Sequence, residues 1–201
     1  MRILTVFASI LAVLLVAQMA ASPIAASLTA AERQRLIAHL DMTGAWLIDE
    51  VSGLSTAQLQ FRPAPDAWSI LQVLNHLLVV KAIYWDDLQK AVSGPPSRRA
   101  TSTTDADILW YGIDRTFREK AIPSEVPSGD LRDLKAGLDT YRRRHAQLRQ
   151  YVGMTNDDLR SHVVERQGCD AYQWALLIST HEQRHILQIR EIKTHSNFPK
   201  K

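Results

Sequence analysis

The sequence has little of what small proteins use for cross-links or metal clusters. Its 201 residues include a single cysteine, Cys169. One cysteine cannot close an internal disulfide, and it cannot supply the thiolates of a zinc finger or of an iron–sulfur centre. A disulfide scaffold, a zinc finger and an iron–sulfur protein are therefore excluded. Seven histidines remain as the better candidates for chemistry.

An excess of charge of one sign is also lacking. The chain carries 24 basic and 21 acidic residues, so its net charge is +3. This near balance gives no reason to expect a nucleic-acid partner. Because 46% of the residues are hydrophobic, disorder is not expected, and the length suits one globular domain with or without a processed end.

The start of the chain has the three parts of a secretory signal peptide, which we predict over residues 1–27. Arg2 provides the positive start, residues 3–21 form an uncharged and mostly apolar run, and small residues dominate positions 20–27. The apolar run is also close to the ~20 residues that span a bilayer, so an uncleaved membrane anchor is the alternative.

Cleavage after Ser27 would leave a mature domain of residues 28–201, and a cut nearer Ala21 is also compatible with the pattern. We therefore expect a secreted or periplasmic protein that has no contact with the membrane once the signal is removed.

The rest of the chain predicts five helices in succession. Three of them begin with a capping pair, in which two side chains three residues apart satisfy backbone amides of the first turn. These pairs are Thr29 with Glu32, Thr104 with Asp107, and Asp170 with Gln173. The predicted helices cover residues 29–51, 67–92, 104 to just before 123, 130–152 and 170–195. Extended structure is expected only near 163–164, so the sequence predicts an all-α, up-and-down helical bundle.

Two histidines share the apolar face of the last predicted helix. At about 100° per residue, His181 and His185 fall on one stripe, one turn apart. The stripe is completed by Trp174, Leu177, Ile178, Gln188, Ile189 and Ile192, whereas Gln183, Arg184, Arg190, Glu191 and Lys193 occupy the other faces. Burying two polar rings side by side costs free energy unless both find partners, and a shared metal ion suits this spacing.

A third histidine, His76, lies within the apolar stretch 70–80 of the second predicted helix. Catalytic zinc sites usually have three protein ligands and one open position, so His76 is the candidate third ligand. The alternative is an ordinary core histidine that is hydrogen-bonded to a neighbour. The placements of the other histidines, His39, His145, His162 and His195, indicate no special role, and Cys169 is expected to be inert.

Residues 181–185 also match the H-E-x-x-H motif of zinc peptidases, in which the glutamate, here Glu182, is the general base. The candidate downstream ligand for such a site is Glu191. Six residues along an unbroken helix turn by ~240°, so Glu191 would face away from His185. A zinc peptidase is therefore the least favoured interpretation.

Two stretches together resemble the DinB-like superfamily of bacterial four-helix-bundle metalloproteins. They are 67–77, AWSILQVLNHL, and 181–189, HEQRHILQI, and the likeness in helix order extends from Leu28 to about Thr194. The resemblance implies a four-helix bundle in which His76, His181 and His185 bind a divalent metal ion, most often zinc or nickel.

The resemblance also implies an activity on a small molecule, because members of known activity are thiol transferases, isomerases that use thiols, or hydrolases. We therefore expect a metal-dependent hydrolase or a thiol (S-)transferase whose partner is a small-molecule substrate or thiol. A metal- or ligand-binding bundle without catalysis is the alternative. Glu182 is a candidate catalytic base, or else a hydrogen-bond acceptor or surface charge of the helix. The apolar helix faces also make a homodimer a reasonable expectation.

Overall fold

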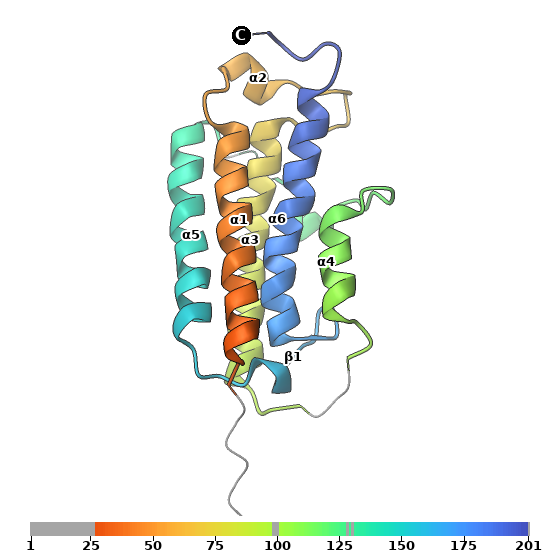
Figure 1. Ribbon diagram of the computed structural model, residues 1–201. Coiled ribbons are helices and arrows are strands. Elements are labelled where there is room, and N and C mark those ends of the chain that lie inside the picture. Colours follow the sequence, from red (N-terminus) through yellow and green to blue (C-terminus); the bar gives the residue numbers. More distant parts are fainter. Residues whose placement is uncertain (1–26, 98–100, 128, 130, 201) are drawn as a thin grey trace, which may run out of the picture.

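The computed structural model describes residues 27–97, 101–127, 129 and 131–200 (Figure 1). The described residues form six α-helices, two short 3-10 helices and a two-stranded ribbon. The α-helices are α1 (Ala30–Val51), α2 (Thr56–Gln60), α3 (Ile70–Ser93), α4 (Asp105–Ile113), α5 (Leu134–Met154) and α6 (Ala171–Lys193). The smaller elements are η1 (Pro123–Glu125), η2 (Leu159–Ser161), β1 (Val163–Val164) and β2 (Cys169–Asp170).

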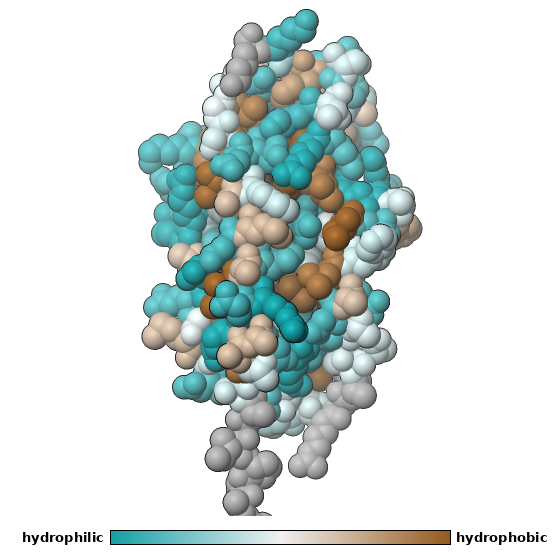
Figure 2. Space-filling model, in the orientation of Figure 1, coloured by the Kyte–Doolittle hydropathy of each residue, from teal (hydrophilic) through white to brown (hydrophobic). Residues whose placement is uncertain are grey.

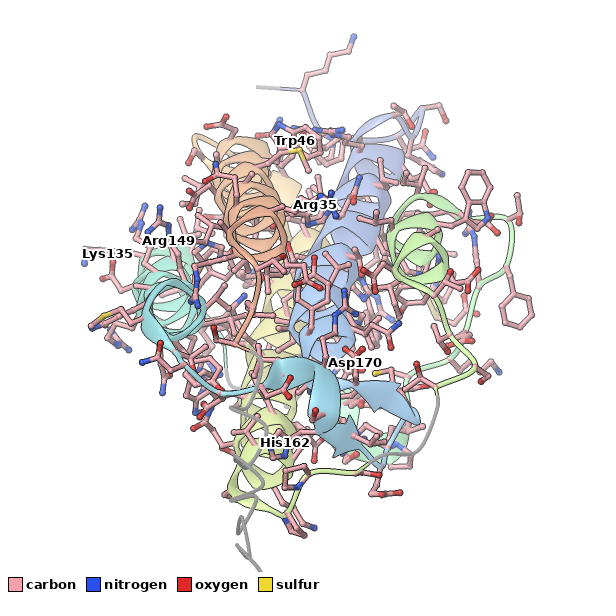
Figure 3. The ribbon with its side chains drawn as sticks, turned by 60° about the horizontal axis from the view of Figure 1, so that its bottom comes forward. Arg35, Trp46, Lys135, Arg149, His162 and Asp170 are labelled. Carbon is pink, nitrogen blue, oxygen red and sulfur yellow. The ribbon has the colours of Figure 1, made fainter. Side chains whose placement is uncertain are left out.

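The four long helices α1, α3, α5 and α6 form a bundle, and α4 packs outside it against α6 (Figures 1 and 3). Helices α1 and α6 run in one direction, and α3 and α5 run in the other. Arg149 of α5 reaches Asp41 of α1, with 2.5 Å between Nε and Oδ1 (Figure 3). The all-α prediction is therefore confirmed, and the expected extended structure at residues 163–164 is the first strand of the ribbon.

The order of directions is not the simple alternation that we expected, because α3 and α5 are parallel. Near the start of both helices, Leu74 of α3 lies close to Gly137 of α5. Further along both helices, Trp85 of α3 contacts Tyr151 of α5. The physical reason is the connection 94–133, which includes α4 and returns the chain to the end of the bundle where α3 began. A short loop would instead have forced the next helix to run back alongside α3.

The predicted helix starts depend on local hydrogen bonds that the structure contains. Thr29, Thr104 and Asp170 are the N-caps of α1, α4 and α6, and each forms the expected capping box. Ser69 caps α3 in the same way with Gln72. The short helix α2 was not predicted, although Ser55 and Gln58 carry the same signature.

Two helix boundaries differ most from the prediction. Helix α4 ends at Ile113 instead of continuing towards Pro123, and the guanidinium of Arg184 donates to the backbone oxygens of Tyr111, Asp114 and Phe117 at that end. These bonds satisfy carbonyls that a longer helix would have used internally. Helix α5 begins at Leu134, after the N-cap Asp133, instead of near residue 130.

Helix α6 is the central helix of the molecule, because α1, α3 and α4 all pack against it. Its residues from Ala171 to Glu182 are buried on every face. Arg184, which we expected on an outer face, is also buried, because α4 covers that side of the helix. Gly112 permits this close approach, since a Cβ atom there would lie 2.9 Å from the Cβ of Thr180.

The predicted signal peptide lies outside the described residues except for its last position, Ser27. In the part of the chain that the structure describes, no helix is long and apolar enough to cross a membrane.

Candidate metal centre

The structure brings together the three histidines that the sequence singled out. His76 comes from α3, and His181 and His185 come from successive turns of α6. The Nε2 atom of His181 lies 3.3 Å from Nε2 of His76 and 3.1 Å from Nε2 of His185. One nitrogen from each ring can be chosen so that all three lie within 4.8 Å of one another. Three imidazole nitrogens therefore converge on one point.

Aromatic rings surround this cluster. The indole of Trp68, just before α3, lies 4.9 Å from the ring of His76 and 6.5 Å from that of His185, measured between centroids. Tyr84 lies 5.8 Å from the ring of His181. His76 and His181 are buried, whereas His185 is partly exposed. The cluster is thus bordered by aromatic rings, and His185 is its partly exposed member.

Two of the rings are held by hydrogen bonds to their outer nitrogens. His76 Nδ1 lies 2.6 Å from the backbone oxygen of Glu125 in η1, and His185 Nδ1 lies 2.7 Å from Oε1 of Gln188. Both oxygens accept hydrogen bonds, so each Nδ1 carries the proton and donates it. In a neutral ring, the Nε2 atom then has a lone pair that points at the centre of the cluster.

Burial keeps all three rings neutral at physiological pH. It lowers the pKa of His185 to about 3, with a further contribution from the neighbouring His76. The pKa of His181 is well below its usual value because of burial and the other two rings. Burial also lowers the pKa of His76, against the effect of its bond to Glu125. The three neutral rings therefore keep nitrogen lone pairs available instead of carrying an extra proton.

This donor set fits a divalent metal ion. Lone pairs of His76 and His185 face a third nitrogen at close range, and one proton on His181 could satisfy only one of them at a time. A divalent ion would accept all three lone pairs, and outer hydrogen bonds that fix the tautomer are typical of histidine ligands. Imidazole ligands suit zinc, nickel and several other transition metals, so the donor set does not identify the ion.

Glu182 directs its carboxylate into a second polar cluster. Its Oε1 forms a buried ion pair with Nζ of Lys81 on α3. Its Oε2 accepts from the hydroxyl of Tyr141 on α5 at 3.1 Å and lies 3.3 Å from Oγ1 of Thr43 on α1. The carboxylate thus has partners on three helices, and these partners occupy both of its oxygens.

The second cluster continues across the bundle towards α1 and α5. Thr43 Oγ1 lies 2.9 Å from Oγ of Ser179, which in turn lies 2.6 Å from Nδ1 of His39. His145 Nδ1 lies 3.2 Å from the Tyr141 hydroxyl, and burial lowers the pKa of His145 to about 4. His39 and His145, for which the sequence indicated no role, are therefore members of this buried network.

Glu191 and Cys169, which were also considered from the sequence, lie outside both clusters. Glu191 is held by Arg115, with Nε 2.8 Å from its Oε1, and α6 continues unbroken past it. It is therefore not brought to the three histidines as a peptidase ligand would be. Cys169 is buried, and burial raises the pKa of its thiol to about 12, so it is not a reactive thiolate.

Besides His39 and His145, sequence reasoning missed two further features of these clusters. Lys81 is a single charge following the long apolar stretch of α3, and this isolation was a usable signal for a buried partner. The contribution of Glu125 could not have been found, because its backbone carbonyl makes the contact and any residue type offers one.

Comparison with known proteins supports the fold and the family. A model of the DinB superfamily matches residues 39–189. The uncharacterized protein YuaE of Bacillus subtilis is 28% identical over 151 residues, which cover 72% of this chain and 89% of YuaE. A solved structure of YfiT from Bacillus subtilis, described as a probable metal-dependent hydrolase with an unusual four-helix bundle topology, is similar with a TM-score of 0.58. That similarity covers 86% of this chain and 92% of YfiT at 15% identity.

Proposed function

We propose that this chain, which belongs to the DinB superfamily, is a metal-dependent hydrolase that binds one divalent ion through His76, His181 and His185 and acts on a small molecule. The observation that carries the proposal is the convergence of three neutral imidazoles with two tautomers fixed from outside. The description of YfiT as a probable metal-dependent hydrolase supports the same class of activity.

The chemistry follows from the charge of the donor set. Three neutral ligands would leave a bound divalent ion with its full charge, so it would polarise a substrate oxygen and favour deprotonation of a bound nucleophile. A thiol substrate could use the same site, which makes thiol (S-)transfer the second candidate. Export, which residues 1–27 predict, disfavours that candidate because reduced thiols are scarcer outside the cytoplasm.

The protein residues around the site would orient the ligands and shape access. Gln188 and the carbonyl of Glu125 hold the rings of His185 and His76 in the ligating tautomer. Trp68 covers two of the ligands. Since His185 is the partly exposed ligand, we propose that the substrate approaches from its side.

Glu182 has a structural role in this proposal. A general base needs a free carboxylate oxygen within reach of the substrate, whereas both oxygens of Glu182 are engaged by Lys81, Tyr141 and Thr43. The ion pair would instead join α6 to α3 and stabilise the bundle that carries the three histidines.

The test is elemental analysis of the purified protein, followed by assay with a panel of small esters, amides and thiol acceptors. The proposal expects about one divalent ion per chain, loss of that ion in His76→Ala and His181→Ala, and metal-dependent hydrolysis of at least one panel member. Turnover of thiol acceptors alone would select the transferase. Full metal content with no turnover would favour the non-catalytic bundle, and well under one equivalent of metal would remove every metal-based hypothesis.

A further inference from the structure

The backbone oxygen that orients His76 follows a poorly buried stretch of the chain. Residues 116–124 are exposed to solvent except for Ala121, and η1 contains no buried residue. Large apolar side chains in and beside this stretch also stay at the surface, namely Phe117, Ile122 and Val126. Figure 2 shows brown, hydrophobic residues on the side of the molecule where α4 lies. Apolar burial therefore contributes little to holding this stretch on the bundle, so its position depends on polar contacts.

Glu125 is the residue at which the stretch turns inward. Its side chain is 12% exposed, and its backbone oxygen lies 2.6 Å from Nδ1 of His76. Its carboxylate faces the guanidinium of Arg166, with 3.3 Å between Oε1 and Nη1. One residue therefore contacts a candidate metal ligand through its main chain and an arginine through its side chain.

Arg166 lies in the turn between β1 and β2, and this turn is well supported. The amide of Gly168 closes the turn on the backbone oxygen of Val164, at 2.9 Å. Just before β1, Nδ1 of His162 donates to the backbone oxygen of Ala91 in α3, at 3.0 Å. The side chain of Arg166 thus reaches towards η1 from a turn that is fixed to the bundle.

The same guanidinium also binds α3. Its Nε lies 2.7 Å from Oδ2 of Asp87, which is about three turns after His76 on that helix. The planar guanidinium of arginine is suited to binding two carboxylates at once, and Arg166 thereby joins Asp87 to Glu125. Without the cation these two carboxylates would repel each other, and η1 would move away from α3 together with the carbonyl that faces His76.

We propose that Arg166 is a positioning residue of the metal centre, which holds the carbonyl of Glu125 where it accepts the Nδ1 proton of His76. This inference rests on the proposed function, because it takes His76 as a metal ligand. Partners that bind the outer nitrogen of a histidine ligand fix its tautomer, and losing one typically costs about 10–100-fold in metal affinity. A backbone carbonyl is not removed by substitution, so the side chains that hold it are the means of testing its role.

The first readout is the affinity of the purified protein for Zn²⁺, measured by competition with a chromophoric chelator. Arg166→Ala is expected to lower this affinity by about tenfold, and so is Glu125→Ala, although its backbone carbonyl is retained. Arg166→Lys keeps a cation between the two carboxylates and should recover part of the loss. Arg149→Ala breaks the surface ion pair with Asp41 and is the matched control, which should bind Zn²⁺ like the wild type.

The second readout is the tautomer of His76 in the metal-free protein, determined from its nitrogen-15 NMR shifts. The wild type should carry the proton on Nδ1, whereas Arg166→Ala and Glu125→Ala should show a mixture of the two tautomers. The free energy of unfolding should stay close to that of the wild type, because partly exposed ion pairs contribute little to it. A purely structural role of Arg166 would change that free energy and leave the tautomer unchanged.

The outcomes separate this inference from the proposed function. Wild-type affinity and a wild-type tautomer in Arg166→Ala would overturn the inference. So would a loss in Arg166→Ala that Glu125→Ala does not share, because the guanidinium also lies 5.9 Å from the ring centroid of Tyr84 and would then act through that ring. A wild type that binds no Zn²⁺ or other divalent ion would refute the proposed function, and the tautomer of His76 would still decide whether Arg166 orients this ring.

Discussion

Two polar clusters lie inside the bundle, and consecutive residues of α6 belong to different ones. His181 joins His76 and His185, where lone pairs converge and the proton donors point outward. Glu182 joins Lys81, where an anion meets a cation and neighbouring hydroxyl groups complete the hydrogen bonding. Both clusters connect α3 to α6, yet the second is satisfied by the protein alone and the first is not.

This difference separates buried polar groups with a structural role from those that are candidates for a functional role. A buried polar group without a partner costs free energy, so a cluster that is complete in itself contributes to the structure. A cluster of like groups whose lone pairs face one another remains costly until something else binds. The incomplete cluster is therefore the candidate for function, and the complete one contributes to the stability of the bundle.

The largest effect is expected from breaking the complete cluster. Glu182→Ala leaves the buried ammonium of Lys81 without its carboxylate, and the free energy of unfolding should fall by about 3–5 kcal/mol. Chemical denaturation of the variant and the wild type measures this loss.

The matched control for that variant removes both charges together. Lys81→Met with Glu182→Leu should recover most of the lost stability, since no buried charge is left unpaired. A double variant as unstable as the single one would show that the ion pair itself is not what Glu182 provides.

A smaller effect is expected from loosening the incomplete cluster at its outer side. Gln188→Ala removes the acceptor that fixes the tautomer of His185, so metal affinity should fall by about 10–100-fold. Competition with a chromophoric chelator measures the affinity. Unchanged affinity would mean that the bond to Gln188 does not prepare the ligand.

Acid should destabilise the metal-free protein through its histidines. In the unfolded chain an imidazole takes up a proton below about pH 6.5, whereas in the folded protein the pKa of His185 is about 3. The unfolded state therefore binds more protons below pH 6.5, and stability falls as the pH decreases. His185 alone should contribute a loss of about 2 kcal/mol by pH 5 and none above pH 7.

Denaturation of chelator-treated protein at a series of pH values tests this expectation. His185→Gln should show a smaller dependence than the wild type between pH 6.5 and pH 5. Equal slopes for the two proteins would contradict the assignment of a neutral His185 in the fold.

The smallest effect is expected at the edge of the complete cluster. Thr43→Val keeps the shape of the side chain and removes the hydroxyl that lies near Glu182 and Ser179, so it should cost about 1 kcal/mol. Thermal unfolding would detect this loss, and the metal content should not change. A change in metal content would mean that the two clusters are not independent.

Local signals in the sequence predicted much of the fold, because helix caps and apolar stripes depend on neighbouring residues. Thr29, Thr104 and Asp170 cap the helices as expected. The parallel arrangement of α3 and α5 could not be predicted, because it depends on the path of the connection 94–133 and not on the pattern of either helix.

The candidate site also combines features that local sequence patterns predicted with features that depend on how the helices pack. The shared face of His181 and His185 followed from helical periodicity, and the partnership with His76 was a hypothesis that needed the packing of α3 on α6. The direction of Glu182 could not be settled from its position next to His181. Its side chain turns towards Lys81 because α1, α3 and α5 meet α6 on that side of the helix.

The most direct test compares the bound metal of variants at the two consecutive positions of α6. Elemental analysis should find about one divalent ion per chain in the wild type and in the Lys81→Met, Glu182→Leu double variant. It should find almost none in His181→Ala, whose fold is verified by circular dichroism. Full metal content in His181→Ala, or its loss from a folded double variant, would contradict the separation of the two clusters on which this account depends.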